Sequence, residues 1–184
     1  MTWLDRSLQQ WRIRMARREL PPGARVLDIG THDGELFRRA QVGGLGIDPE
    51  LVETASPPGV TLVKGFFPDD LPELPEESFG AATALAVIEH IPEGDLPTWA
   101  KEMARLVTPK GVLIITVPSP TVDKILHVLI RLHLADGMEA HQHHGFQVSS
   151  LDHIFSAPLW QRTKHRTFQL GLNNLFVFER TPNP

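Results

Sequence analysis

Short apolar segments alternate with amphipathic or polar segments along most of the chain, and this alternation restricts the fold more than any other feature. Strand-like runs lie at residues 25–30, 45–48, 60–64, 80–87 and 112–117, and helix-like stretches at residues 33–40 and 95–107. The first run shows no clean polar alternation, as expected of a strand that helices cover on both faces. Strands separated by helices pair in parallel through right-handed crossovers. The pattern therefore predicts an α/β protein with a mostly parallel sheet.

The last two strand-like runs depart from this rhythm. Residues 166–170 and 175–178 are joined by only the four residues 171–174. A connection of this length can form only a hairpin, so the final pair must be antiparallel. We therefore expect a Rossmann-like, doubly wound sheet of seven strands, mostly parallel, with an antiparallel C-terminal hairpin.

Composition excludes several classes of protein. The chain contains no cysteine, which rules out disulfides, thiolate catalysis and cysteine-ligated zinc. No apolar run approaches the roughly 18 residues of a membrane span, and the N-terminus lacks the apolar core of a secretory signal. We therefore expect a cytoplasmic protein. The formal net charge of −4 gives the chain as a whole no attraction for a polyanion, so we expect no nucleic-acid partner.

Arginine is concentrated at the start of the chain. The first twenty residues contain Arg6, Arg12, Arg14, Arg17 and Arg18. The simplest interpretation is the solvated face of an amphipathic helix whose other face carries the apolar side chains Leu4, Leu8, Trp11 and Met15. Two alternatives stay open, namely a lid that recognises an anionic acceptor and a local nucleic-acid patch.

The first strand-like run leads into a glycine-containing loop, GTHDG at residues 30–34, and Asp48 ends the next run. Open parallel sheets bind ligands beyond the C-terminal ends of their strands. Glycine lets such a loop bend sharply and approach a ligand closely. A carboxylate at the neighbouring strand end can accept hydrogen bonds from both hydroxyls of a ribose. The arrangement predicts a nucleoside site, the alternative being a tight turn with no ligand.

The loop favours S-adenosylmethionine over a dinucleotide. A dinucleotide site requires G-x-G-x-x-G, and here His32 and Glu35 replace the second and third glycines. Asp28, Asp33 and Glu35 surround the start of the following helix, where they would repel a pyrophosphate. Carboxylates suit a ligand that bears an ammonium group and a sulfonium. The antiparallel C-terminal pair is also foreign to dinucleotide-binding folds.

These residues belong to a set of motifs that resembles the class I S-adenosylmethionine-dependent methyltransferases, including small ubiquinone-pathway methyltransferases. The motifs, in the family's order, are VLDIGTHDGEL (26–36), GIDPE (46–50), KGFFPDDLP (64–72), ALAVIEHI (84–91) and LVTPKGVLIITVP (106–118). The closing hairpin resembles the family's sixth and seventh strands. The resemblance implies an enzyme that transfers a methyl group from S-adenosylmethionine.

The resemblance also implies the residues that hold the cofactor. They are Asp28, Gly30, Thr31, Gly34, Asp48, Phe66, Phe67, Ala84, Leu85 and Ala86. Asp28 would approach the cofactor's amino group and Asp48 its ribose, the phenylalanines would lie at the adenine, and residues 84–86 would floor the pocket near the sulfonium. Two positions depart from the family: His32 replaces a loop glycine, and Phe66 stands where relatives commonly carry an aspartate for the adenine amino group.

Histidine is the expected general base if the acceptor is a hydroxyl, because it titrates near neutral pH. The candidates are His90, after the fourth strand, and His143, in a cluster with His141 and His144. The chain has no cysteine or tyrosine, and a carboxylate is too weak a base unless its pKa is strongly shifted. The alternatives are a packing or capping role for His90 and an exposed polar loop for the cluster.

Glu89-His90 followed by distal histidines also resembles the metal site of RNA 3′-terminal 2′-O-methyltransferases. That family carries a further glutamate three residues before the pair, where this chain has Ala86. We therefore expect no metal site.

We expect one domain over residues 1–184. It comprises an N-terminal helix (1–20), a cofactor-binding core (25–118), an acceptor-side insertion (119–160) and the closing hairpin (162–180). The expected reaction is methyl transfer to an oxygen or nitrogen of a small-molecule acceptor. A non-catalytic S-adenosylmethionine-binding module and a metal-assisted RNA-type 2′-O-methyltransferase are the alternatives. The acceptor and the oligomeric state are not predicted.

Overall fold

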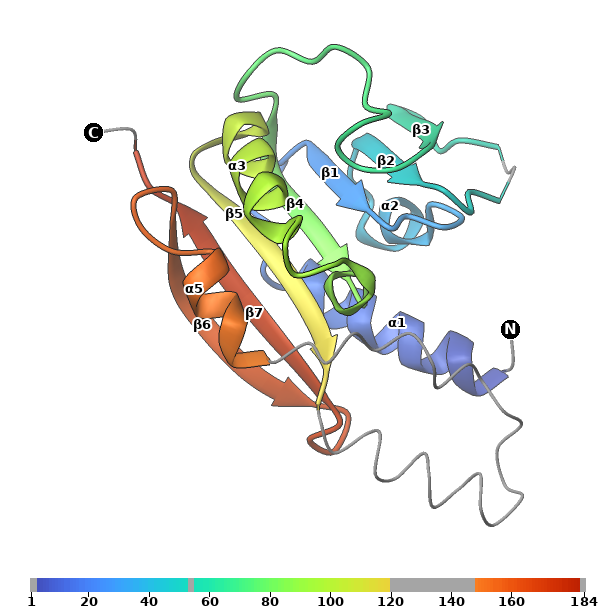
Figure 1. The fold of residues 1–184 in the computed structure, drawn as a ribbon. Coiled ribbons are helices and arrows are strands. Elements are labelled where there is room, and N and C mark those ends of the chain that lie inside the picture. Colours follow the sequence, from blue (N-terminus) through green and yellow to red (C-terminus); the bar gives the residue numbers. More distant parts are fainter. Residues whose placement is uncertain (1–2, 53–54, 120–147, 183–184) are drawn as a thin grey trace.

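The computed structural model describes residues 3–52, 55–119 and 148–182, which form a seven-stranded sheet (Figure 1). The strand order is β3-β2-β1-β4-β5-β7-β6. The strands are β1 (Val26–Ile29), β2 (Gly44–Asp48), β3 (Val60–Lys64), β4 (Phe79–Leu85), β5 (Val107–Pro118), β6 (Trp160–Phe168) and β7 (Asn173–Arg180). The five strands from β3 to β5 pair in parallel, whereas β7 pairs antiparallel with both β5 and β6. The predicted fold class is confirmed.

Helices cover both faces of this sheet. They are α1 (Trp3–Arg17), α2 (Glu35–Ala40), α3 (Leu96–Leu106) and α5 (Leu151–Ile154), with short 3-10 helices η1 (Ile88–His90) and η2 (Val148–Ser150). Apolar side chains of α3 and α5 belong to the largest core cluster, whereas those of α1 and α2 pack in two separate clusters. Figure 1 shows α3 and α5 on one face of the sheet and α1 and α2 on the other.

Helix α1 is held against the C-terminal hairpin. The Gln169 side-chain amide, in the β6–β7 turn, donates to the Leu8 carbonyl at 2.9 Å, and Lys164 pairs with Glu19 at 2.6 Å. The helix therefore runs with its N-terminal turns toward the edge at which β4 and β5 end (Figure 1). Among its described residues, Ile13, Met15 and Ala16 are buried.

The position of Trp11 corrects the expected apolar face of this helix. Trp11 was expected among the buried side chains with Met15, but its side chain is 44% exposed. The core contacts come from Ile13 and Ala16, which lie one turn apart on the helix. With the helix rotated so that Ile13 and Ala16 face the sheet, Trp11 points away from the sheet and toward solvent.

Strand β5 begins earlier than its apolar run. The sequence predicts a strand over residues 112–117, but β5 also includes residues 107–111, at which its pairing with β4 is irregular. Val107 pairs with Phe79, the register then shifts, and pairing resumes between Val112 and Ala81. Lys110 takes the left-handed conformation (φ 64°) at this bulge. Residues 108–111 therefore form a bulged part of β5 and do not separate it from α3.

Candidate functional site

The candidate site lies where the parallel strands end around β1. In the sheet, β2 and β4 are the two neighbours of β1, so the chain crosses in opposite directions from this strand. Ligands of open α/β sheets bind at such a switch point, beyond the carboxyl ends of the strands. The loop 30–34 follows β1, Asp48 ends β2, and residues 84–86 end β4. The structure therefore brings these predicted segments to one edge of the sheet.

The loop after β1 depends on left-handed backbone conformations. Gly30 and Gly34 have φ of 77° and 74°, and His32 has φ of 51° between them. Glycine adopts this region without strain, whereas other residues do so at some cost. A Cβ built on Gly30 would lie 2.2 Å from a methyl group of Val87. Glycine is required at position 30 both by its φ and by this contact.

Asp28 is a buried carboxyl at the centre of the site. It lies in β1 directly beside Thr83 of β4, whose hydroxyl donates a 2.6 Å hydrogen bond to Asp28 Oδ1. Burial raises the pKa of Asp28 from 3.8 to about 7, although the bond from Thr83 lowers it in part. The negative charges of Asp48 and Asp33 act in the same direction as burial. Because a buried charge is costly, ionised Asp28 requires a cationic partner.

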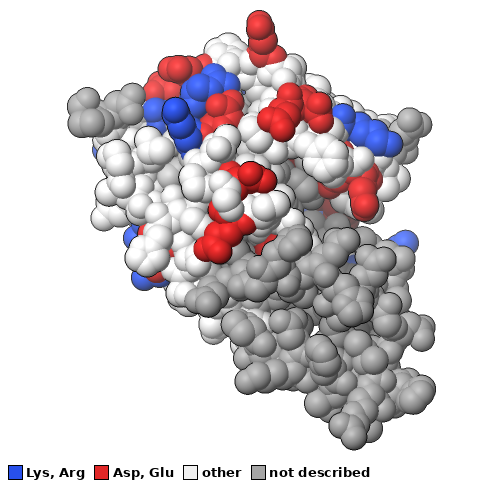
Figure 2. All heavy atoms as spheres, in the orientation of Figure 1, with Lys and Arg blue, Asp and Glu red and all other residues white. Residues whose placement is uncertain are grey.

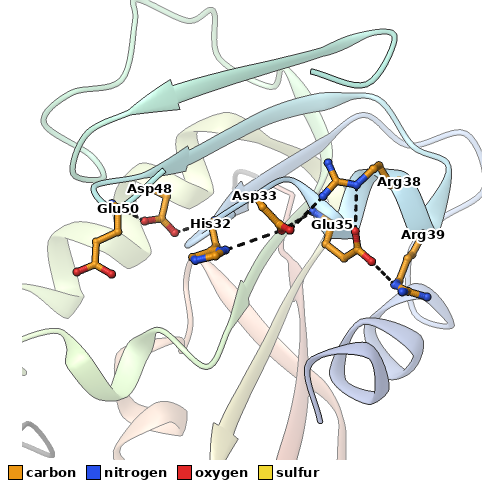
Figure 3. Close-up of polar contacts among 7 residues, drawn as sticks. All are labelled: His32, Asp33, Glu35, Arg38, Arg39, Asp48 and Glu50. Atoms are coloured by element: carbon orange, nitrogen blue, oxygen red, sulfur yellow. Dashed lines mark hydrogen bonds and ion pairs between the residues drawn. The ribbon is translucent and has the colours of Figure 1, made fainter. Parts of the chain in front are cut away.

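The Asp48 carboxylate links the loop after β2 to the loop after β1 through hydrogen bonds (Figure 3). Its Oδ2 accepts a hydrogen bond from the His32 backbone N–H at 2.8 Å, and its Oδ1 accepts one from the Glu50 N–H at 2.7 Å. The side chain is largely buried. A carboxylate offers about four lone-pair positions, so two acceptor positions remain for a ligand.

Two further acidic residues, Asp33 in the loop and Glu35 at the start of α2, form ion pairs with arginines of α2 (Figure 3). Asp33 pairs with Arg38 at 3.2 Å, and Glu35 pairs with both Arg38 (3.0 Å) and Arg39 (2.5 Å). The sequence suggested that Asp28, Asp33 and Glu35 all present negative charge at the helix start. In the structure, arginines offset the negative charges of Asp33 and Glu35. Asp28 is the one of the three that has no ion pair among the described residues.

Phe66 and Phe67 take different environments after β3. The Phe67 ring is buried and packs edge-on against Trp99 of α3, with ring centroids 4.9 Å apart, whereas Phe66 is 65% exposed. Asp70, which sequence analysis did not select, accepts a 2.7 Å hydrogen bond from the Phe66 N–H. A Cβ on Gly65 would lie 2.4 Å from that of Asp70, so a carboxylate lies directly against the strand end.

Residues 84–86 and Thr31 line the remaining sides of this edge. Ala84 is fully buried in β4, Leu85 is partly buried, and Ala86 has a left-handed φ of 60° as the chain leaves the strand. The Ala86 N–H donates to the Thr116 carbonyl of β5 at 2.9 Å. Thr31 is buried with its side chain against Gly46 of β2, where a Cβ would lie 2.6 Å from the hydroxyl oxygen.

The predicted catalytic histidines are only partly described. His90 is exposed at the end of η1, whereas His141, His143 and His144 lie outside the described residues. The neighbouring Glu89 is buried, and its Oε2 has no hydrogen-bond partner among the described residues. Burial raises the pKa of Glu89 to about 7, against the lowering effects of its own backbone and of the Arg12 charge.

Within residues 3–52, 55–119 and 148–182, no group of three or more histidines and acidic residues is placed to hold a metal ion. In the same segments, no helix is long and apolar enough to cross a membrane.

Comparison with known sequences assigns the chain to a family. The profile of the family described as methyltransferase domain matches residues 2–157. The 2-methyl-6-phytyl-1,4-hydroquinone methyltransferase of Synechocystis sp. is 36% identical over 107 residues, which cover 52% of this chain. The match covers 32% of that relative, so the chain spans about a third of its length.

Solved structures share the fold at low sequence identity. An S-adenosylmethionine-dependent methyltransferase from Mesorhizobium loti has a TM-score of 0.67 at 16% identity, covering 92% of this chain and 98% of that chain. The 1,6-didemethyltoxoflavin-N1-methyltransferase of Burkholderia thailandensis, solved with 1,6-didemethyltoxoflavin and S-adenosylhomocysteine, has a TM-score of 0.66 at 17% identity, covering 98% and 81%. With the profile match over most of its length, the chain belongs to the class I S-adenosylmethionine-dependent methyltransferases.

Proposed function

We propose that this protein transfers the methyl group of S-adenosylmethionine to an oxygen or nitrogen of a small-molecule acceptor. The observation that carries the proposal is the pair of buried carboxylates, Asp28 and Asp48, beside the glycine-containing loop at the switch point of the sheet. S-adenosylmethionine is the cofactor of the family to which the chain belongs. When bound, it supplies a methyl group that its sulfonium has already activated.

The donor set of the site suits each polar part of this cofactor. Asp28 would bind the ammonium group, which supplies the positive charge that a buried carboxylate requires. Asp48 would accept hydrogen bonds from the two ribose hydroxyls with the lone pairs that His32 and Glu50 leave free. Gly30, Thr31 and Gly34 would flank the methionine part.

The adenine would lie at the end of β3. The exposed ring of Phe66 is available for stacking, and Phe67 would support it from the core, where it packs on Trp99. Asp70 would accept from the adenine amino group in place of the aspartate that Phe66 replaces, because its carboxylate already lies at the Phe66 N–H. Ala84, Leu85 and Ala86 would form the floor near the methyl group.

Methyl transfer depends mainly on holding the acceptor in line, with a base where the acceptor must lose a proton. His90 and His143 remain the proposed bases. Glu89 joins them, because its raised pKa overcomes the objection that an ordinary carboxylate is too weak near neutral pH.

Two relatives suggest the kind of acceptor. One is named for a phytyl-substituted hydroquinone, and another was solved with the flat heteroaromatic ligand 1,6-didemethyltoxoflavin. We propose an aromatic acceptor with a ring hydroxyl or ring nitrogen. The test is formation of S-adenosylhomocysteine with a panel of hydroquinones and N-heteroaromatics. Cofactor binding with no turnover on any of them would favour the non-catalytic binding module.

Replacing Asp48 with alanine is expected to weaken cofactor binding by about 10- to 150-fold, because hydrogen bonds to a charged group contribute about 1.5–3 kcal/mol. Isothermal titration calorimetry with S-adenosylhomocysteine measures the change. Glu50→Ala is the matched control, since only the Glu50 backbone N–H contacts Asp48. An unchanged dissociation constant in folded Asp48→Ala, or heat from NAD in the wild type, would contradict the assignment.

A further inference from the structure

The outer face of α1 carries unpaired positive charge. Arg6, Arg14 and Arg17 are exposed along it. In the part of the chain that the structure describes, Arg14 and Arg17 have no carboxylate within ion-pair distance, whereas Arg38 and Arg39 of α2 are paired with acids. The arginines of α1 are therefore available to an external anionic partner.

A groove of about 670 Å³ runs beside these arginines, between α1 and α2. Its lining includes Gln10, Trp11, Arg14 and Arg17 of α1 and Arg39 of α2, and it includes no residue of the loop 30–34. Trp11 is a large aromatic side chain left 44% exposed among these cations. The groove thus combines an apolar ring with positive charge.

A second exposed apolar side chain lies at the same end of the molecule. Leu170, at the tip of the β6–β7 turn, is 95% exposed. Its neighbour Gln169 donates to the Leu8 carbonyl of α1, one turn before Trp11. We call the set Arg6, Trp11, Arg14, Arg17 and Leu170 the basic rim.

We propose that the basic rim docks the protein on the surface of an anionic phospholipid bilayer. Arg14 and Arg17 would bind headgroup phosphates in the groove, with Trp11 and Leu170 entering the interface between headgroups and acyl chains. The apolar residues Ile13, Met15 and Ala16 of α1 are packed on the sheet, so the helix rests on the bilayer without burying a whole face in it.

The charge distribution would orient the protein on such a surface. Figure 2 shows the molecule in the orientation of Figure 1, in which acidic side chains gather on the side that carries α3. Helix α1 lies on the other face of the sheet. An anionic surface therefore attracts the basic rim and repels the face with α3.

This docking proposal rests on the proposed function, because docking would bring the cofactor-binding edge to an acceptor in the bilayer. The N-terminal turns of α1 lie toward the edge of the sheet where β4 and β5 end (Figure 1). The cofactor-binding loops lie at that same edge. A protein held by the basic rim would present this edge to an acceptor that reaches it from the bilayer, and the acceptor would be an aromatic ring on an apolar chain.

The test is co-sedimentation of the full chain with vesicles of phosphatidylcholine, with and without about one third phosphatidylglycerol. We expect binding only to the anionic vesicles, weaker at high salt, and a blue shift of the tryptophan fluorescence that Trp11→Phe removes. The double variant Arg14→Glu/Arg17→Glu should bind at least about 30-fold more weakly, from the usual contribution of basic residues near an anionic surface. Lys101→Glu/Lys110→Glu, with the same charge change at two exposed lysines outside α1, should retain binding.

Equal binding to neutral and anionic vesicles, no binding to either, or equal loss in the two double variants would overturn the proposal. So would binding of a single-stranded oligonucleotide that depends on Arg14 and Arg17 while vesicles are ignored, which would assign the groove to nucleic acid. Calorimetry with S-adenosylhomocysteine on the same variants keeps this result separate from the proposed function. A failure of vesicle binding with intact cofactor binding contradicts the docking surface alone.

Discussion

Replacing Asp28 with asparagine is expected to stabilise the folded protein at pH 8 and to weaken cofactor binding. Burial raises the pKa of this carboxyl from 3.8 to about 7. The folded protein therefore holds a proton that the unfolded chain releases, and wild-type stability falls as the pH rises from about 4 to about 7. Each tenfold change in proton affinity corresponds to about 1.4 kcal/mol, so ionisation of Asp28 costs the folded state up to about 4 kcal/mol above pH 7.

Asparagine keeps the shape of the side chain and can accept the Thr83 hydrogen bond, but it does not ionise. Its N–H groups need partners, which offsets part of the gain. We expect the free energy of unfolding of Asp28→Asn at pH 8 to exceed that of the wild type by about 2–4 kcal/mol. The difference should shrink toward zero near pH 4. Urea unfolding at several pH values measures it.

The same variant should lose the partner of the cofactor's ammonium group. We expect its affinity for S-adenosylhomocysteine at pH 8 to fall by at least about 100-fold, as when one member of a buried ion pair is removed. Wild-type affinity should fall below pH 7, where binding must first ionise Asp28, and that pH dependence should vanish in Asp28→Asn. Asp33→Asn, the same change at a residue paired with Arg38, is the control. Lower stability or unchanged affinity in Asp28→Asn would contradict the assigned role.

The fold was predictable because its signals are local. The apolar runs are short, a four-residue connection excludes a crossover, and the loop after β1 together with Asp48 follows a spacing that the family shares. The position of Asp48 at the end of β2 agrees with that prediction. The buried face of α1 was less predictable. Ile13, Ala16 and Trp11 are all apolar, and the packing of the helix against the sheet determines that Ile13 and Ala16 are buried and Trp11 is exposed.

The electrostatics of the site could not be derived from the sequence. Asp28, Asp33 and Glu35 all carry a carboxyl group, so the sequence does not distinguish them. Only the geometry of α2 places Arg38 and Arg39 against Asp33 and Glu35. The burial of Glu89 beside the exposed His90 is likewise a property of η1 and its packing. Asp70 gave no signal of its own, because its approach to Gly65 depends on how the chain folds back after β3.

Replacing Gly30 with alanine is expected to destabilise the protein by about 2–5 kcal/mol, for two separable reasons. The left-handed φ of 77° costs a residue with a Cβ about 1–2 kcal/mol. The new methyl group would also lie 2.2 Å from Val87 Cγ2, and overpacking of this kind costs about 1–3 kcal/mol. Because this loop follows Asp28, the shift that relieves the clash should also weaken cofactor binding.

Two further variants separate the two causes. Gly23 has a similar φ of 71° with nothing within 4 Å of a built Cβ, so Gly23→Ala should show the cost of the backbone conformation alone. Val87→Ala removes the methyl group that the new side chain would meet. In a double-mutant cycle measured by urea unfolding, Gly30→Ala and Val87→Ala should couple favourably by at least about 1 kcal/mol. If Gly30→Ala costs no more than Gly23→Ala, or the cycle shows no coupling, Val87 does not confine the loop, and the left-handed conformation alone accounts for the glycine.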